Sequence, residues 1–186
     1  MIPRVVLADD LTGACEVAGL GVDRGLRAEV CLEPDSGEPA LVELRVFSTE
    51  TRLLPPAAAA AQVKAFAKAL PAGVPLFKKT DSVLRGPVAA ELAALAEVRG
   101  VSRVLLVAAN PDLHRHVVNG HYTVAGVPLH QTAFARDPHH PARTDHVGRL
   151  VGPWPGAGST VIVDPGAPLP AQGLIVGNAA SARDLA

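Results

Sequence analysis

The chain has 186 residues, a formal net charge of −1 and an apolar content of 48%, values typical of one folded domain with a sizeable core. Near-zero charge without a basic cluster argues against duplex nucleic acid as a partner, and an aromatic content of 3% argues against a platform for single strands. No apolar run approaches the ~20 residues of a membrane span and the start lacks a signal-peptide core, so we expect a cytoplasmic protein. Cys15 and Cys31 are not spaced as metal ligands and are expected to be reduced thiols.

Short β-branched segments alternate with alanine- and leucine-rich segments along the first hundred residues. The segment 55–70 has proline at its first turn, where the missing N–H costs little, and a run of alanines with high helix propensity. Regular β–α alternation predicts an α/β fold: an open, largely parallel sheet with helices on both faces, in a Rossmann-like three-layer arrangement. The predicted strands are 5–7, 28–32, 41–47, 74–77 and 101–108, and the predicted helices are 13–25, 55–70 and 87–99.

The second half of the chain departs from this alternation. Segment 101–108 is a continuous apolar run, which predicts a strand buried on both faces. Residues 110–150 are polar and rich in proline and histidine, so we expect long loops and a hairpin there. Two more strands and a linker-like loop complete what we expect to be a single domain over 1–186. These are the loop 152–159 and the strands 160–163 and 173–177.

Polar side chains follow several of the predicted strands directly. Because ligands in open parallel sheets bind beyond the carboxyl ends of the strands, these groups are expected to converge on one edge. Together they suit a small polyhydroxylated anion, with cations for a carboxylate or phosphate and acids for hydroxyls. The groups are Asp9, Asp10 and Thr12, followed by 48–52, 78–86 and 110–116.

Each of these groups also has a purely structural interpretation. Asp10 precedes a predicted helix and would act as its cap. Lys78 and Lys79 would be solvated, and Arg85 would pair with Glu91.

Known phosphate-binding motifs are missing from the sequence. There is no GxxxxGK[ST] loop, and the glycines of 19–25 are one residue too far apart for GxGxxG. All seven histidines lie between 114 and 146, and a pair such as His114 and His116 is a common type of metal ligand. Their proline-rich loop context, without Cys or Glu to complete a set, favours surface or hydrogen-bonding histidines. A metallo-hydrolase is therefore an outlying hypothesis, and no metal site is assigned.

Five strings run in order along nearly the whole chain: ADDLTGA (8–14), TETR (49–52), KKTDSVLRG (78–86), NGHYTVAGVPLHQTAFARDPHHP (119–141) and LIVGNAASARDLA (174–186). Together they resemble the N-terminal domain of the four-carbon acid sugar kinase family. Members of that family are two-domain, ATP-dependent kinases that phosphorylate acids such as threonate or erythronate. The resemblance implies that this domain holds the sugar acid, while a C-terminal domain supplies the ATP site.

The resemblance also implies roles for individual residues. Asp9, Asp10 and Asp81 are the candidate catalytic acids, one of which would accept the proton of the attacking hydroxyl. Arg52, Lys79 and Arg85 would fix the carboxylate of the substrate. The implied substrate-binding set is Asp10, Arg52, Lys79, Asp81, Ser82, Arg85, Arg115 and Asn119.

Some positions depart from the family pattern. Ser48 stands where the family usually has Asp, and the loop after the fifth predicted strand reads NPDLHRH at 110–116. The tail has Asn-Ala-Ala at 178–180 where the family usually has Ser-Ala-Gly. The sequence ends where the ATP domain is expected. No cofactor is therefore assigned to this chain, whereas ATP and Mg²⁺ are expected for the complete family enzyme.

Three hypotheses remain open at this point. The first is a sugar-acid-binding domain that is inactive without a nucleotide-binding domain. The second is half of a split kinase, completed by a separate ATP-binding chain. The third is a degenerate, non-catalytic binding or regulatory protein, which Ser48 and the altered 110–116 loop favour. The expected partners are a small sugar acid and either a separate nucleotide-binding domain or a second copy of the chain, without nucleic acid or membrane.

Overall fold

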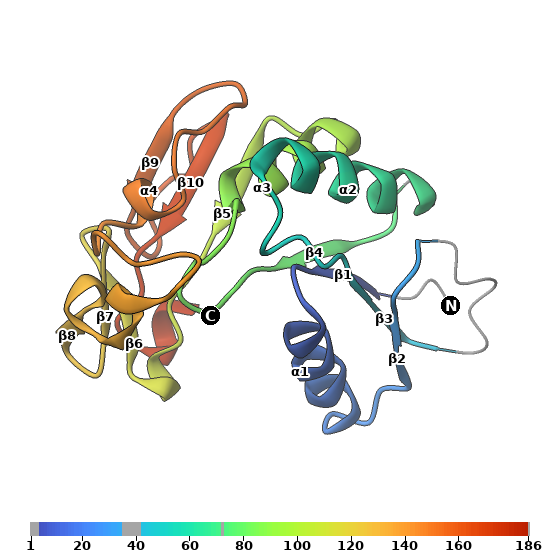
Figure 1. Cartoon of the computed structure of the whole chain (residues 1–186), viewed down its shortest axis with the longest axis horizontal. Helices are drawn as coiled ribbons and strands as arrows, with labels where there is room; N and C mark the ends of the chain where they lie inside the picture. The colour runs from blue at the N-terminus through green and yellow to red at the C-terminus, as the bar shows by residue number, and fades with distance from the viewer. Residues whose placement is uncertain (1–3, 35–41, 72, 186) are drawn as a thin grey trace. The chain divides into compact units, whose positions relative to one another are not determined.

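The computed structural model describes residues 4–34, 42–71 and 73–185 (Figure 1). The chain divides into two compact units, which we call unit 1 (Met1–Asp81 and Ala90–Arg99) and unit 2 (Ser82–Ala89 and Gly100–Ala186). The single domain expected over 1–186 stays a prediction, and each unit is described by itself. Among the described residues, no helix combines the length and apolarity needed to cross a bilayer.

Unit 1 contains a four-stranded, fully parallel sheet. Its strands have the order β2-β3-β1-β4. The register pairs Ala8 of β1 with both Ser48 of β3 and Lys79 of β4, so these three strands end at the same edge. The strands are β1 (Arg4–Ala8), β2 (Ala28–Cys31), β3 (Leu44–Ser48) and β4 (Leu76–Lys79). Residue 41, where the third strand was expected to begin, lies outside the described residues.

Helices cover both faces of this sheet, because alternate residues of β1 point in opposite directions. Val5 and Leu7 belong to one buried cluster with residues of α2 and α3, including Phe66. Val6 and Ala8 belong to another with residues of α1. The predicted α/β fold, with a largely parallel sheet and helices on both faces, is confirmed. The helices are α1 (Leu11–Val22), α2 (Pro56–Ala69) and α3 (Val88–Arg99).

Unit 2 contains two further three-stranded sheets, so the predicted parallel strands do not form one sheet. The parallel sheet has the order β5-β10-β9, and the antiparallel sheet has the order β6-β7-β8. An apolar segment indicates that a strand is present but not which strand it pairs with. The division of the parallel strands between two sheets was therefore not predicted. The parallel strands are β5 (Arg103–Leu106), β9 (Thr160–Val163) and β10 (Gly173–Gly177). The antiparallel strands are β6 (Arg115–Val118), β7 (His121–Val124) and β8 (Val127–Pro128).

Strand β5 is shorter and less buried than expected. Leu106 is buried, whereas Leu105 and Val107 are 53% and 41% exposed. The prediction of burial on both faces is therefore wrong for β5, which lies at the edge of its sheet. The central strand β10 is the one that is buried along its whole length.

The hairpin expected within 110–150 is formed by β6 and β7. Its two turn residues, Asn119 and Gly120, have φ angles of 51° and 74°, the left-handed values that a tight primed hairpin turn requires. A Cβ on Gly120 would lie 2.2 Å from Cδ1 of Ile162, so a side chain there would require the end of the Ile162 side chain to move. The loop expected at 152–159 is irregular and joins α4 (Val147–Leu150) to β9 within unit 2. Four short 3₁₀ turns complete the described elements: η1 (Pro111–Leu113), η2 (Leu129–Gln131), η3 (Ala133–Arg136) and η4 (Ala182–Leu185).

Candidate functional site

The common edge of β1, β3 and β4 carries the polar segments predicted to meet there. Backbone hydrogen bonds join the segment after β3 to the end of β1. The amide of Thr49 donates to the carbonyl oxygen of Ala8 at 2.8 Å, and that of Thr51 donates to the carbonyl oxygen of Asp9 at 2.9 Å. The Thr49 hydroxyl also donates to the Ala8 oxygen, again at 2.8 Å. These bonds bring Arg52 to the end of β1, although the two are more than forty residues apart in the sequence.

Three carboxylates surround the guanidinium of Arg52, and we call Asp9, Asp10 and Asp81 with Arg52 the acid cluster. Arg52 forms a bidentate ion pair with Asp9, in which Nε lies 3.0 Å from Oδ2 and Nη2 lies 3.1 Å from Oδ1. Its Nη1 donates to Oδ2 of Asp10, and Nη2 lies 3.6 Å from Oδ1 of Asp81. The side chains of Asp9 and Asp81 are 2% and 4% exposed, whereas that of Asp10 is 20% exposed.

The charges of the cluster favour the ionised guanidinium. Burial works against the charge on Arg52, but the hydrogen bond and charge of Asp9, together with the charges of Asp81 and Asp10, raise its pKa above the usual value. Three negative groups face one positive group here, so the cluster carries a surplus of hydrogen-bond acceptors. Arg52 thus has carboxylate partners within the protein, and its expected contact with a substrate carboxylate stays a prediction.

Asp10 acts as the cap of α1 and also belongs to the cluster. Its Oδ1 accepts from the backbone N–H of Gly13 at 2.8 Å, and its backbone is extended, as at a helix N-cap. A Cβ on Gly13 would lie 2.9 Å from this oxygen and 3.7 Å from Nζ of Lys79. The structural interpretation of Asp10 is therefore confirmed, and it is compatible with the functional one.

The two neighbouring lysines of β4 point to opposite faces of the sheet. Lys79 lies beside the start of α1, where its Nζ is 3.2 Å from Oε2 of the exposed Glu16. Lys78 is buried against α3, with Nζ 2.9 Å from Oε2 of Glu91, which is also buried. The expectation that both lysines are solvated is wrong for Lys78. Oε1 of Glu91 is buried without a hydrogen-bond partner.

The remaining predicted residues lie in unit 2. Arg85 pairs with Asp137, at 3.0 Å, so the expected pairing with Glu91 is wrong. The carbonyl oxygen of Ser82 accepts a hydrogen bond from the hydroxyl of the buried Tyr122. Arg115 begins β6 and Asn119 occupies the hairpin turn. The structure therefore brings Asp9, Asp10, Arg52, Lys79 and Asp81 to one edge of the unit 1 sheet, whereas 110–116 follows β5, a strand of the separate parallel sheet of unit 2.

Several histidines of unit 2 gather around one carboxylate. Nδ1 of His121 lies 3.1 Å from Oδ2 of Asp145, and Nδ1 of His130 lies 3.5 Å from Oδ1. The rings of His121 and His146 meet edge to face, with centroids 5.4 Å apart. In the described parts of the chain, no three histidine, cysteine or acidic side chains form a group that could hold a metal ion. Cys15 and Cys31 are both free thiols.

Sequence reasoning missed three partners that complete these sites: Glu16 beside Lys79, Glu91 beside Lys78 and Asp137 beside Arg85. Strand alternation predicts that one of two consecutive lysines points inward. No local pattern indicated which acid each cation would meet.

A parallel sheet whose strand ends carry an acid-rich cluster defines an α/β protein with a candidate site for small polar ligands at that edge. The comparisons place it more closely. Residues 4–155 match the model of the sugar-binding N-terminal domain family, and the chain belongs to that family. The resemblance found in the sequence is thereby confirmed.

Curated relatives include sugar-acid kinases. The chain is 32% identical over 151 residues to a D-threonate kinase of Salmonella typhimurium, an alignment that covers 79% of this chain and 36% of the kinase. It is 35% identical over 153 residues to a D-erythronate kinase of Heliobacterium modesticaldum, covering 79% of this chain and 35% of the kinase. The alignments thus cover little more than a third of the length of these curated relatives.

Solved structures share the fold. A domain of unknown function from Bordetella bronchiseptica, crystallised with bound citrate as a domain-swapped dimer, superposes with a TM-score of 0.82 at 28% identity. The match covers 98% of this chain and 48% of that one. A putative tRNA synthase from Salmonella typhimurium superposes with a TM-score of 0.85 at 21% identity, over 100% of this chain and 50% of that one. At that identity the second match supports the fold alone.

Proposed function

We propose that this chain is the sugar-acid-binding domain of a four-carbon acid sugar kinase, with acids of the threonate and erythronate type as ligands. The observation that carries the proposal is the acid cluster at the common end of β1, β3 and β4. Ionised carboxylates only accept hydrogen bonds, so a surplus of them recognises the hydroxyl groups of a polyol. The names of the curated relatives support the class of ligand.

Lys79 is the group best placed to bind the carboxylate of such an acid. Its ammonium lies beside the first turn of α1, close to Gly13, where the helix dipole also favours an anion. Its partner Glu16 is exposed, and an exposed ion pair is worth little, so a ligand carboxylate can replace Glu16. Arg52 then serves to hold the three carboxylates in place.

Asp10 is our candidate for the group that accepts the proton of the reacting hydroxyl. It is the most exposed carboxylate of the cluster, whereas Asp9 is buried with both oxygens engaged by Arg52. Oδ2 of Asp9 also accepts from the backbone N–H of Asp81, at 3.2 Å. We therefore assign Asp9 a positioning role and Asp10 a direct contact with the ligand.

The described residues do not fit a site for ATP phosphates or Mg²⁺. The sequence lacks a P-loop, and the three carboxylates of the cluster are directed at Arg52 rather than gathered as metal ligands. We therefore assign the phosphoryl-transfer machinery to a further domain, in the same chain or a separate one, and derive no step through ATP here.

Calorimetric titration with D-threonate, D-erythronate and the uncharged polyol threitol tests the proposal. We expect the acids to bind to the folded chain and threitol to bind more weakly, because it lacks the carboxylate. Asp10→Asn keeps a good helix cap but removes the charge, and should weaken binding at least tenfold. Asp23→Asn, at the exposed end of the same helix, is the matched control and should leave affinity unchanged. If neither acid binds at millimolar concentration while the chain is folded, the proposal is wrong.

A further inference from the structure

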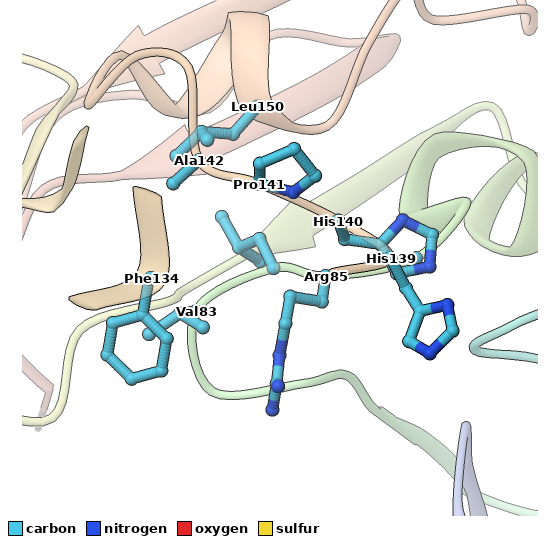
Figure 2. A pocket seen from close by; sticks show the side chains of 10 residues that line it. Val83, Arg85, Phe134, His139, His140, Pro141, Ala142 and Leu150 are labelled. Atoms are coloured by element: carbon cyan, nitrogen blue, oxygen red, sulfur yellow. The ribbon is translucent and has the colours of Figure 1, made fainter. Parts of the chain in front are cut away.

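Unit 2 contains a pocket of about 280 Å³ that the proposed function does not use (Figure 2). One wall is the segment 83–86, and the other is formed by residues between Phe134 and Leu150. Ligand pockets commonly have volumes of roughly 300–1,000 Å³, so this one suits a ligand of few heavy atoms.

The polar lining of the pocket is basic. Its charged or titratable lining residues are Arg85, His139 and His140, and no carboxylate is among the described residues that line it. Figure 2 shows the Arg85 side chain between Phe134 on one side and the two histidines on the other. The Arg85 guanidinium carbon lies 5.9 Å from the centre of the Phe134 ring, a cation–π distance. The remaining residues of both walls are apolar.

Asp137 organises this lining without belonging to it. Its Oδ2 pairs with Arg85, while its Oδ1 accepts from the backbone N–H groups of His139, at 3.0 Å, and His140, at 2.8 Å. The hydrogen bond from the His140 amide, with help from Arg85, lowers the pKa of Asp137 to about 2. This carboxylate is thus ionised and shared among three donors, and it fixes both basic walls.

The segment that carries Arg85 is held in an unusual conformation. Leu84 has a φ angle of 63°, which is costly for a bulky side chain, and Gly86 has a φ angle of 95°. The buried side chains of Val83 and Leu84 and the hydrogen bond from Tyr122 to Ser82 hold the segment in place. Strain of this kind persists where the surrounding structure enforces it, and it is common at ligand sites.

We propose that this pocket is an oxyanion-binding site, which takes a carboxylate or phosphate group through Arg85, His139 and His140. A guanidinium fork and imidazole N–H groups donate to such an anion, and the apolar walls accommodate the carbon atoms attached to it. The family resemblance implies that Arg85 contacts the substrate carboxylate. The inference goes beyond that implied role and beyond the proposed function, because it adds His139 and His140 and requires neither the acid cluster nor a sugar acid.

Titration of the folded full chain with inorganic phosphate, and separately with D-threonate, tests the proposal. The variant His139→Leu/His140→Leu should weaken oxyanion binding about tenfold or more, since it removes the imidazole N–H donors and their hydrogen bonds to the anion. Arg85→Lys keeps the charge but loses the fork, and should weaken binding by a similar factor while the chain stays folded. Arg143→Gln removes an exposed cation that does not line the pocket, and should change affinity less than about twofold.

The two anions distinguish a phosphate site from a carboxylate site. Loss of phosphate affinity in the pocket variants supports a phosphate site, and loss of threonate affinity alone supports a carboxylate site. If neither anion binds to the folded chain, or if binding is unchanged in both pocket variants, the inference is wrong. A chain that binds phosphate in the pocket but never binds a sugar acid would contradict the proposed function alone. Threonate binding that depends on Asp10, together with phosphate and threonate affinities that are unchanged in both pocket variants, would contradict the inference alone.

Discussion

The acid cluster of unit 1 and the basic pocket of unit 2 use an arginine–aspartate pair in opposite ways. In the cluster, one arginine holds three carboxylates, and the surplus groups are acceptors. In the pocket, one aspartate holds an arginine and two backbone amides, and the lining groups are donors. The same type of ion pair therefore lies within a group rich in hydrogen-bond acceptors in one unit and beside a pocket lined by hydrogen-bond donors in the other.

The supports of the two regions also differ. The register of parallel strands fixes the cluster, because three strands end together. A strained loop segment and a single carboxylate fix the pocket. Changes within the buried parts of the unit 1 sheet should therefore act on global stability, whereas changes at the pocket should act mainly on local geometry.

The largest effect is expected from the buried pair of Lys78 and Glu91 in unit 1. Glu91→Ala leaves Lys78 buried without its counter-ion and should lower the free energy of unfolding by about 3–5 kcal/mol. Glu97→Ala removes an exposed partner of Lys64 and should cost about 0–1 kcal/mol. Urea denaturation measures both. Equal effects of the two substitutions would show that Lys78 and Glu91 do not form a buried pair.

A smaller, pH-dependent effect is expected at the pocket. The folded-state pKa of Asp137, about 2, lies below its ordinary value of 3.8, so its stabilisation is complete above pH 3.8 and is lost as the pH falls through 2. After allowance for solvent screening, Asp137→Asn should cost about 1 kcal/mol at neutral pH, with the difference from the parent shrinking toward pH 2. Urea denaturation at several pH values measures this. A cost that does not change with pH would contradict the assignment of an ionised Asp137.

The smallest effect is expected at the rim of the cluster. Glu16→Gln removes the exposed partner of Lys79 and should change stability by less than about 1 kcal/mol. Because Lys79 then loses a competing carboxylate, affinity for D-threonate should rise about two- to threefold. Calorimetry measures the change, with Asp23→Asn as the control. A fall in affinity would indicate that Glu16 itself contacts the ligand.

Much of the cluster was predictable from the sequence. An apolar strand followed by Asp9 and Asp10 predicts acids at a strand end, and parallel pairing brings strand ends together. That reasoning correctly grouped Asp9, Asp10, Arg52, Lys79 and Asp81. It could not tell which cation each acid would hold, because ion pairs depend on the register between distant strands.

The pocket was not predictable in the same way. Arg85 stood out as a cation, but Asp137 lies 52 residues further along, and no periodic pattern connects them. Residues 139–140 were noted only as part of a histidine-rich segment and of the 119–141 string that resembles the family, without a role. The division of the parallel strands between two sheets was not predictable for the same reason. Strand β5 is apolar like β1, but it pairs with β10. Local patterns indicate burial and turns, whereas pairing between distant segments is decided by the folded structure.

The most direct test of the central claim is a crystal structure of this chain with D-threonate bound. We expect a hydroxyl oxygen of the acid within about 3 Å of a carboxylate oxygen of Asp10, with the carboxylate of the acid at Lys79. A bound acid that contacts none of Asp9, Asp10 and Asp81 would contradict the claim that the acid cluster is the sugar-acid site.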